Sequence, residues 1–246
     1  MTQTLLLAGL LFVTAILYTA VGHGGASGYL AVMALVGLTP AAMKPTALVL
    51  NILVATVATL RYARARAFSW PALWPFLLGS VPLAFLGGAV HLPGSLYRPV
   101  VGAILLIASA RLLWPGKRAV DTLPAPRMPT PPAVAAGAGI GFLSGLTGTG
   151  GGIFLSPLLL FTRWLDTRQT AGVSAAFILV NSIAGLAGNF TSVRSLPAAL
   201  PLWAVAAAVG GFIGAELGSR KLGNTALQRV LGAVMIIAAV KLLLTQ

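Results

Sequence analysis

Two glycine clusters are the parts of this 246-residue sequence best suited to chemistry. The first is GHGGASG at 22–28 and the second is GTGGG at 148–152. Glycine permits positive φ and lets a ligand approach the backbone closely. A short apolar segment follows each cluster directly, and a helix that starts there points its free N–H groups and the positive end of its dipole at the cluster. Two such helix starts that face each other would form an anion site without any arginine.

Polar side chains in and near the clusters would add hydrogen bonds to this site. Three hydroxyls and one histidine lie in or beside the clusters, and two asparagines lie deep in later apolar segments. An amide at that depth needs a partner, so it either ties helices together or contacts substrate. The predicted substrate-binding residues are His23, Gly24, Gly25, Ser27, Asn51, Thr147, Thr149, Gly150, Gly151, Gly152 and Asn181. The alternative is that the glycines only let helices pack closely, which is the preferred interpretation for Gly87 and Gly88.

Three ionisable residues lie in or beside apolar segments. His23 titrates near neutral pH and could couple proton movement to transport, whereas a lone histidine is more often a satisfied polar group. Glu216 is either a proton relay or an interfacial acid beside Arg220. Lys44, which directly precedes Pro45, is predicted to be an interfacial charge at the mouth of a hairpin.

The elements that carry these residues occur twice. Residues 98–113 return as 228–243, identical at 7 of 16 positions, with a constant offset of 130. At the same offset Asn51 corresponds to Asn181. Membrane transporters commonly bind substrate where two internal repeats meet. The duplication therefore predicts where a substrate would bind.

A proline-rich stretch at 115–131 separates the two copies and is typical of a surface linker. We therefore expect one transmembrane domain over 1–246, with repeat 1 at 1–114 and repeat 2 at 132–246.

The composition indicates a polytopic membrane protein. Apolar residues make up 58% of the chain, charged residues make up 8%, and the mean hydropathy is +0.95, far from the mix found in soluble domains. The net charge of +13 comes from basic residues in loops, where they orient helices and meet anionic lipid, so the expected partners are a lipid bilayer and a small anion, with no nucleic acid.

Catalysis and cofactors are not expected. The chain has no cysteine, two histidines and three acids, too few ligands for a metal cluster of ordinary composition, and it contains neither GxSxG nor HExxH. It also has no nucleotide-binding motif, so any energy source would be an ion gradient or the gradient of the anion itself.

Each half contains five apolar segments, and the second segment of each half has only about ten apolar residues where a bilayer crossing needs about 20. The segments are roughly 4–21, 29–38, 45–60, 70–90 and 98–114, and then 132–147, 153–162, 170–190, 197–216 and 226–244.

The positions of the basic residues predict that the two halves have opposite orientations. The positive-inside rule places the loop with Arg61, Arg64 and Arg66 and the central linker in the cytoplasm, and the loop with Arg194 outside. The expected fold is therefore all-α, with two inverted repeats. Each repeat would have a short, glycine-tipped helical hairpin, re-entrant or nearly so, plus three transmembrane helices. Both termini would lie outside.

These motifs resemble the sulfite exporter TauE/SafE family. The resemblance rests on GLTGTGGGIFLSPLLLF at 145–161 and TAGVSAAFILVNSIAGLAGN at 170–189, with the more divergent counterparts 20–40 and 44–60. It covers nearly the whole chain and implies a multi-pass transporter of the bacterial inner membrane that moves small sulfur-containing anions such as sulfite or sulfoacetate. In this sequence His23 stands where the second half has a hydroxyl or glycine, and Pro45 interrupts its segment.

The function expected from the sequence is secondary transport of a small anion by alternating access to a midplane site between the two glycine-rich tips. The alternatives are a passive anion channel and a structural membrane subunit whose glycines serve packing alone. A bulky residue at Gly151 is expected to abolish uptake while leaving the protein folded.

Overall fold

The structure, a computed structural model, describes residues 2–20, 22–113 and 129–220, together with 236, 239–240 and 243–244. All the regular elements in these residues are helical. They are α1 (Thr2–Thr19), α2 (Ala26–Val36), α3 (Pro40–Arg64), α4 (Trp70–Ala89), α5 (Gly94–Leu113), α6 (Thr130–Thr147), α7 (Gly152–Phe161), α8 (Thr167–Gly188), the 3₁₀ helix η1 (Phe190–Ser195) and α9 (Leu200–Arg220).

The observed helices match nine of the ten predicted segments, with shifted ends. The tenth, 226–244, and most of the linker at 115–131 lie outside the described residues. The prediction that Pro45 interrupts its segment was wrong, because α3 begins at Pro40 and runs on through Pro45. The last matched helix starts at Leu200 because the unpredicted η1 and the loop after it occupy the preceding residues.

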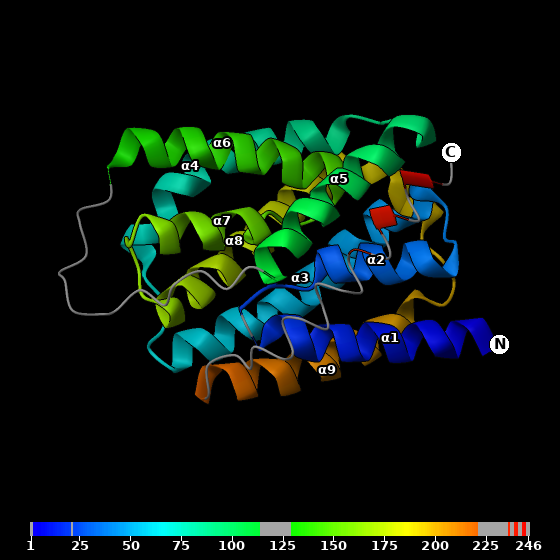
Figure 1. Ribbon diagram of the computed structural model, residues 1–246, viewed down its shortest axis with the longest axis horizontal. Helices are drawn as coiled ribbons and strands as arrows, with labels where there is room; N and C mark the ends of the chain where they lie inside the picture. The colour runs from blue at the N-terminus through cyan, green and yellow to red at the C-terminus, as the bar shows by residue number, and fades with distance from the viewer. Residues whose placement is uncertain are drawn as a thin grey trace.

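Two long helices, α3 and α8, pack against each other in the middle of the molecule (Figure 1). On one side α4 packs along α6 and also touches α8. On the other side α1 packs along α9, and α9 also touches α3. The first helix of each predicted half thus lies against the fourth helix of the other half, and the large interfaces all join the two halves.

Five of the described helices are long and apolar enough to cross a membrane: α1, α3, α4, α8 and α9. Large apolar side chains face outward on them, including Leu78 (59% exposed) and Val205 (63% exposed). Such a surface is unfavourable in water and suits lipid.

The helices α2 and α7 have 11 and 10 residues. At 1.5 Å per residue each is about 15 Å long, half of a hydrocarbon core of about 30 Å. The prediction that these segments are too short to cross alone therefore agrees with their lengths. The first helix of each hairpin, α1 or α6, has 18 residues and is the long arm.

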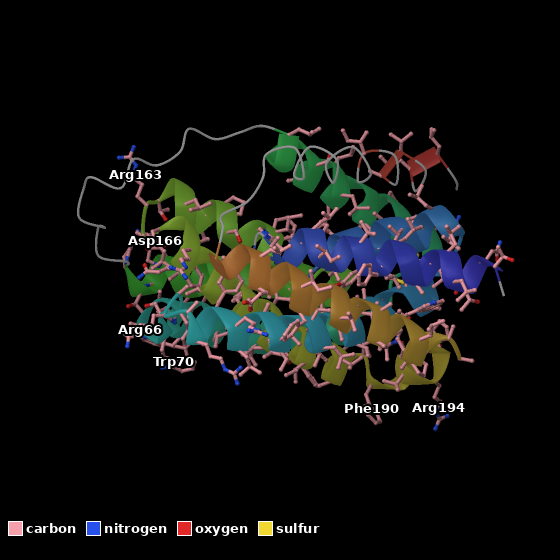
Figure 2. The ribbon with its side chains drawn as sticks, turned by 90° about the horizontal axis from the view of Figure 1, so that it is seen from below. Arg66, Trp70, Arg163, Asp166, Phe190 and Arg194 are labelled. Carbon is pink, nitrogen blue, oxygen red and sulfur yellow. The ribbon has the colours of Figure 1, made fainter. Side chains whose placement is uncertain are left out.

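The hairpins and loops divide between two ends of the molecule. Arg66 and Trp70, from the α3–α4 connection, lie at the same end as Arg163 and Asp166, from the α7–α8 connection (Figure 2). Phe190 and Arg194 of the η1 connection lie at the opposite end, where α1 also begins (Figure 1).

Glycines in α4 and α6 let the two helices approach closely. A Cβ on Gly141 would lie 2.5 Å from Ser80 Cα, and one on Gly87 would run into the carbonyl of Phe142. A Cβ on Gly88 would likewise clash with the backbone of Gly185 in α8. Small residues at helix contacts are the usual means of close packing in membranes, and the packing interpretation of Gly87 and Gly88 is confirmed.

Candidate functional site

The two glycine clusters form the turns at the tips of the α1–α2 and α6–α7 hairpins. Gly25 immediately precedes α2 with φ 96°, and Gly151 immediately precedes α7 with φ 79°. These left-handed conformations favour glycine. No side chain caps either helix start. Each tip therefore presents an uncapped helix N-terminus, where backbone N–H groups and the helix dipole favour an anion.

Both turns reach the same two side chains, Asn51 of α3 and Ile178 of α8. A Cβ on Gly24 would lie 2.7 Å from Ile178 Cγ2 and 3.2 Å from Asn51 Oδ1. A Cβ on Gly150 would lie 2.8 Å from the same Ile178 atom and 2.6 Å from Asn51 Nδ2. Clusters more than 100 positions apart in the sequence thus meet around one asparagine.

Asn51 is fully buried and only half satisfied. Its Nδ2 donates to Ser182 Oγ of α8 at 3.3 Å, and its Oδ1 has no hydrogen-bond partner. Ser182 also lies beside the second turn, because a Cβ on Gly150 would be 3.3 Å from its hydroxyl. Unpartnered buried amide atoms are costly. Asn51 therefore has unused hydrogen-bonding capacity where both turns converge.

Asn181 is placed differently, although it corresponds to Asn51 in the repeat. Its Nδ2 donates to Phe177 O, one turn back on its own helix, at 2.9 Å, and its Oδ1 has no partner. Asn181 is fully buried, but it is not among the nearest neighbours of the turn glycines. The residue beside it, Ser182, contacts Asn51 instead.

The polar residues of the first turn lie against Tyr18 near the end of α1. Ser27 Oγ donates to the Tyr18 hydroxyl at 3.1 Å. The ring of His23 stands edge-on to the Tyr18 ring at 6.5 Å between centroids, and His23 is partly exposed. Tyr18 is a contact that inspection of the motifs alone did not indicate.

The hydroxyls of the second turn bond mainly to each other and to α6. The Oγ1 atoms of Thr147 and Thr149 lie 3.1 Å apart, and Thr147 Oγ1 donates to Leu143 O at 2.7 Å. Tyr97 of α5 donates its hydroxyl to Thr147 O at 3.0 Å. Thr149 is the hydroxyl of this turn for which no backbone acceptor is seen.

Gly151 and Gly152 are packed against neighbouring helices. A Cβ on Gly151 would lie 2.9 Å from Ile140 Cγ2 and 2.9 Å from Phe177 Cε1, and one on Gly152 would lie 2.6 Å from Ile178 Cγ1. The expectation that a bulky residue at Gly151 leaves the fold intact is therefore wrong, because it would combine a positive φ with a steric clash. Gly150 and Gly24 are the glycines that contact Asn51.

The sequence predicts Lys44 to be an interfacial charge, and the structure buries it in protein. Its exposure is 7%, and its ammonium lies within hydrogen-bond distance of the carbonyls of Gly87, Gly88 and Val90 at the end of α4. A lysine beside a proline at the start of an apolar segment resembles a membrane-edge residue, and its long-range contact with α4 is invisible in the sequence. A usable signal was its spacing of seven residues from Asn51, which places both on one face of a helix.

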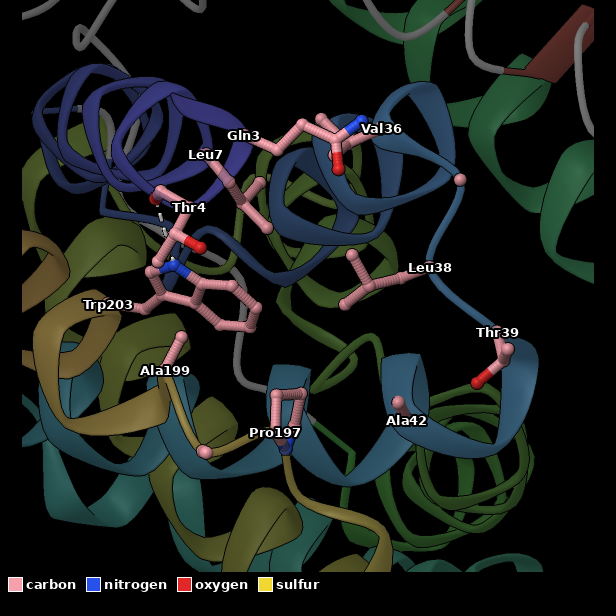
Figure 3. Close-up of a pocket in the computed structure, with 12 residues that line it drawn as sticks. Gln3, Thr4, Leu7, Val36, Leu38, Thr39, Ala42, Pro197, Ala199 and Trp203 are labelled. Atoms are coloured by element: carbon pink, nitrogen blue, oxygen red, sulfur yellow. Dashed lines mark hydrogen bonds between the residues drawn. The ribbon is translucent and has the colours of Figure 1, made fainter. Parts of the chain in front are cut away.

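A surface hollow of about 490 Å³ lies at the end of the molecule where α1 begins and α2 ends (Figure 3). The Trp203 indole lines it and donates to Thr4 O at 3.2 Å. Ala42, at the edge of the hollow, is nine residues before Asn51, which is about 13 Å along α3. Met43 and Leu50 between them are buried at 1% and 0% exposure. Buried apolar residues therefore lie between the hollow and Asn51 along α3.

Long apolar helices, an apolar outer surface and glycine turns held inside the helix bundle define a multi-pass membrane protein, because loose backbone is tolerated at membrane depth only inside protein or beside a cavity. The profile of the family "Sulfite exporter TauE/SafE" matches residues 6–242, and the chain belongs to that family of membrane transporters. It is 44% identical over 248 residues to the "Probable membrane transporter protein y4hK" of Sinorhizobium fredii, covering 98% of this chain and 99% of that protein. No solved structure matches the chain.

Proposed function

We propose that this membrane transporter is a secondary transporter of a small anion, with sulfur-containing oxyanions or organosulfonates such as sulfite or sulfoacetate as the substrate class. The observation that carries the proposal is that the two turns preceding uncapped helix starts place Gly24 and Gly150 beside the half-satisfied amide of Asn51. Helix N-termini favour negative charge, and their backbone amides suit the several oxygens of an oxyanion.

The Asn51 amide can serve this site in either orientation. As it stands, its Nδ2 donates to Ser182 and its Oδ1 has no partner. If the amide turned over, the Ser182 hydroxyl would donate to Oδ1 instead, and Nδ2 would be free to donate to an anion beside Gly24. Asn51 would then be the side-chain donor between the two turns.

The halves 1–114 and 132–246 would be inverted repeats. Support comes from the reciprocal packing of α4 on α6 and α1 on α9. It also comes from the sharing of one end of the molecule by the arginine-bearing α3–α4 and α7–α8 connections (Figure 2). The positive-inside rule would place that end in the cytoplasm of a bacterial inner membrane.

Transport would proceed by alternating access, driven by the gradient of an ion or of the anion itself. The hollow beside Trp203 would be the entrance from one side, and buried side chains such as Met43 and Leu50 would close it. Opening that layer while the other side packs shut would expose the site to each face in turn. A passive channel would need a continuous polar path instead.

Purified protein in detergent tests the proposal most simply. Anions that bind the folded state raise its apparent melting temperature by mass action. The panel is sulfite, sulfate, thiosulfate, sulfoacetate and a carboxylate of similar size. We expect stabilisation by one sulfur-containing class, followed by saturable uptake and exchange in proteoliposomes. If no anion of the panel stabilises the protein, or if the anion flux rises linearly with concentration, secondary anion transport is contradicted.

A further inference from the structure

Lys44 is the one charged side chain that is buried among the residues the structure describes. Its Nζ lies 2.9 Å from Gly88 O, 3.1 Å from Val90 O and 3.4 Å from Gly87 O. These carbonyls end α4, where the helix dipole is negative. The ammonium therefore has partners for its three donors, and all three are neutral.

The described part of the chain offers Lys44 no carboxylate as a counter-ion. Asp166 accepts from the backbone N–H of Gln169 at the start of α8, and Glu216 pairs with Arg61 at 2.6 Å. Buried charges in proteins are usually paired with an opposite charge. Among the described residues, the positive charge of Lys44 is balanced by carbonyl dipoles and by no negative partner.

Lys44 also lies near the candidate anion site. It precedes Asn51 by seven residues, so it is two turns and about 10 Å away on the same face of α3. A Cβ on Gly148, in the second glycine turn, would lie 3.1 Å from Lys44 O and 3.4 Å from Lys44 Cγ. The buried cation thus adjoins the turn whose Gly150 contacts Asn51.

The other half of the molecule has no such charge at the corresponding place. Ser174 stands 130 residues after Lys44, and its Oγ lies 2.8 Å from Ser156 Oγ. In the second half a pair of hydroxyls, one from α7 and one from α8, therefore stands in place of the ammonium. The position seven residues before Asn51 on α3 is therefore positively charged, and the corresponding position on α8 is neutral.

We propose that Lys44 is the counter-charge of the transported anion and makes the site favour divalent over monovalent anions. This inference rests on the proposed anion transport and assigns the charge preference of the same site. The α4 carbonyls hold the ammonium in place, and the anion at the glycine turns supplies the missing negative charge. For an assumed separation of about 10 Å between the ammonium and the anion and an effective dielectric constant of about 20, removal of one positive charge weakens monoanion binding by roughly tenfold and dianion binding by roughly a hundredfold.

The test compares Lys44→Met, Lys44→Gln and Lys44→Arg in the full chain reconstituted in proteoliposomes. Lys44→Gln keeps an amide donor for the α4 carbonyls, so it guards against a variant that fails to fold. For each protein, sulfate and methanesulfonate compete with a labelled transported anion, and the ratio of their inhibition constants is measured. This ratio reports charge preference and is insensitive to a general loss of stability.

We expect the preference for sulfate over methanesulfonate to fall about tenfold in Lys44→Met and Lys44→Gln, and to persist in Lys44→Arg. Arg64→Met is the matched control, because it removes an exposed charge 13 residues beyond Asn51 on the same helix and should leave the ratio unchanged. An unchanged ratio in the neutral Lys44 variants would overturn the inference and leave Lys44 as a cap for α4. A wild-type protein that transports no anion would instead refute the proposed function, and the inference with it.

Discussion

The two glycine turns differ in what surrounds them. Both turns place a glycine beside Asn51 and Ile178, and both precede a short helix without a side-chain cap. In the first turn Ser27 donates a hydrogen bond to Tyr18. In the second turn the threonine hydroxyls bond to each other and to a carbonyl of α6. The backbone is thus nearly symmetric and the side chains are not. Under the proposed function the backbone of both turns would hold an oxyanion, and side chains such as Asn51 and Lys44 would distinguish the two sides.

The largest effect is expected from a side chain added at the second turn. Gly150→Val combines a φ of 75° with clashes against Asn51 and Ile178, so it should lower uptake by at least a hundredfold and reduce stability. Gly24→Ala has no positive φ and meets the flexible Ile178 side chain, so it should lower uptake less, by roughly tenfold. Transport assays and thermal unfolding would compare the two turns.

The control for these glycine variants is Gly139→Ala. Nothing lies within 4 Å of a Cβ at Gly139, which is in the middle of α6. This change should keep full uptake and stabilise the helix by about 0.5–1 kcal/mol. Normal uptake by Gly150→Val would contradict the assignment of the second turn to the site.

The next effect separates the two asparagines. Asn51→Ala should weaken anion binding by roughly tenfold or more, the cost of a lost hydrogen bond to a charged group. Asn181→Ala should lower thermal stability while leaving anion affinity within about twofold, because its amide bonds to its own helix. Anion titration of the melting temperature measures both quantities. Equal losses of affinity in the two variants would show that the asparagines act symmetrically.

A smaller effect, on stability, is expected from removing the buried tyrosine hydroxyls. One such hydroxyl donates a hydrogen bond to a carbonyl at the end of each long hairpin helix, α1 and α6. Tyr62 donates to Thr19 O at 3.2 Å beside the first turn, and Tyr97 donates to Thr147 O at 3.0 Å beside the second. Tyr62→Phe and Tyr97→Phe should each cost about 1 kcal/mol in the free energy of unfolding. The two losses should be similar if the arms are equivalent supports. A loss of stability in only one of the two variants would show that the two hairpin arms are supported differently.

The smallest effect concerns Glu216, whose carboxylate pairs with Arg61 while both side chains are about one-quarter exposed. Glu216→Gln should cost at most about 1 kcal/mol of stability, as for other accessible ion pairs. Uptake driven by a pH gradient should remain within about twofold of wild type, because the pairing with Arg61 accounts for the acid without a proton relay. If Glu216→Gln lost only its response to the pH gradient, with stability unchanged, Glu216 would be a proton relay after all.

The positions of the helices could be predicted because hydropathy and proline or glycine boundaries depend on local sequence. The meeting of Gly24 with Gly150 also agrees with expectation, because two equivalent hairpins that turn inside a bundle bring their tips to the same depth. Local patterns do not reveal 3₁₀ geometry after a helix, so η1 was not predicted.

The details of the candidate site depend on tertiary contacts, which the 130-residue spacing of the repeat does not reveal. Equal spacing suggested equal roles for Asn51 and Asn181, but the partner of each amide is decided by packing across α3 and α8. The burial of Lys44 depends on the end of α4, more than 40 residues away in the sequence. The packing of Gly151 against Phe177 is likewise a tertiary contact.

Anion protection of single cysteines tests most directly whether residues 22–28 and 147–152 line one site. The chain has no native cysteine, so Ser27→Cys and Thr149→Cys each carry one thiol. The rate of labelling by a membrane-permeant maleimide is measured in proteoliposomes against increasing concentrations of the stabilising anion. One shared site predicts that both thiols are protected with the same half-maximal concentration. Protection of only one thiol, or two clearly different concentrations, would contradict it.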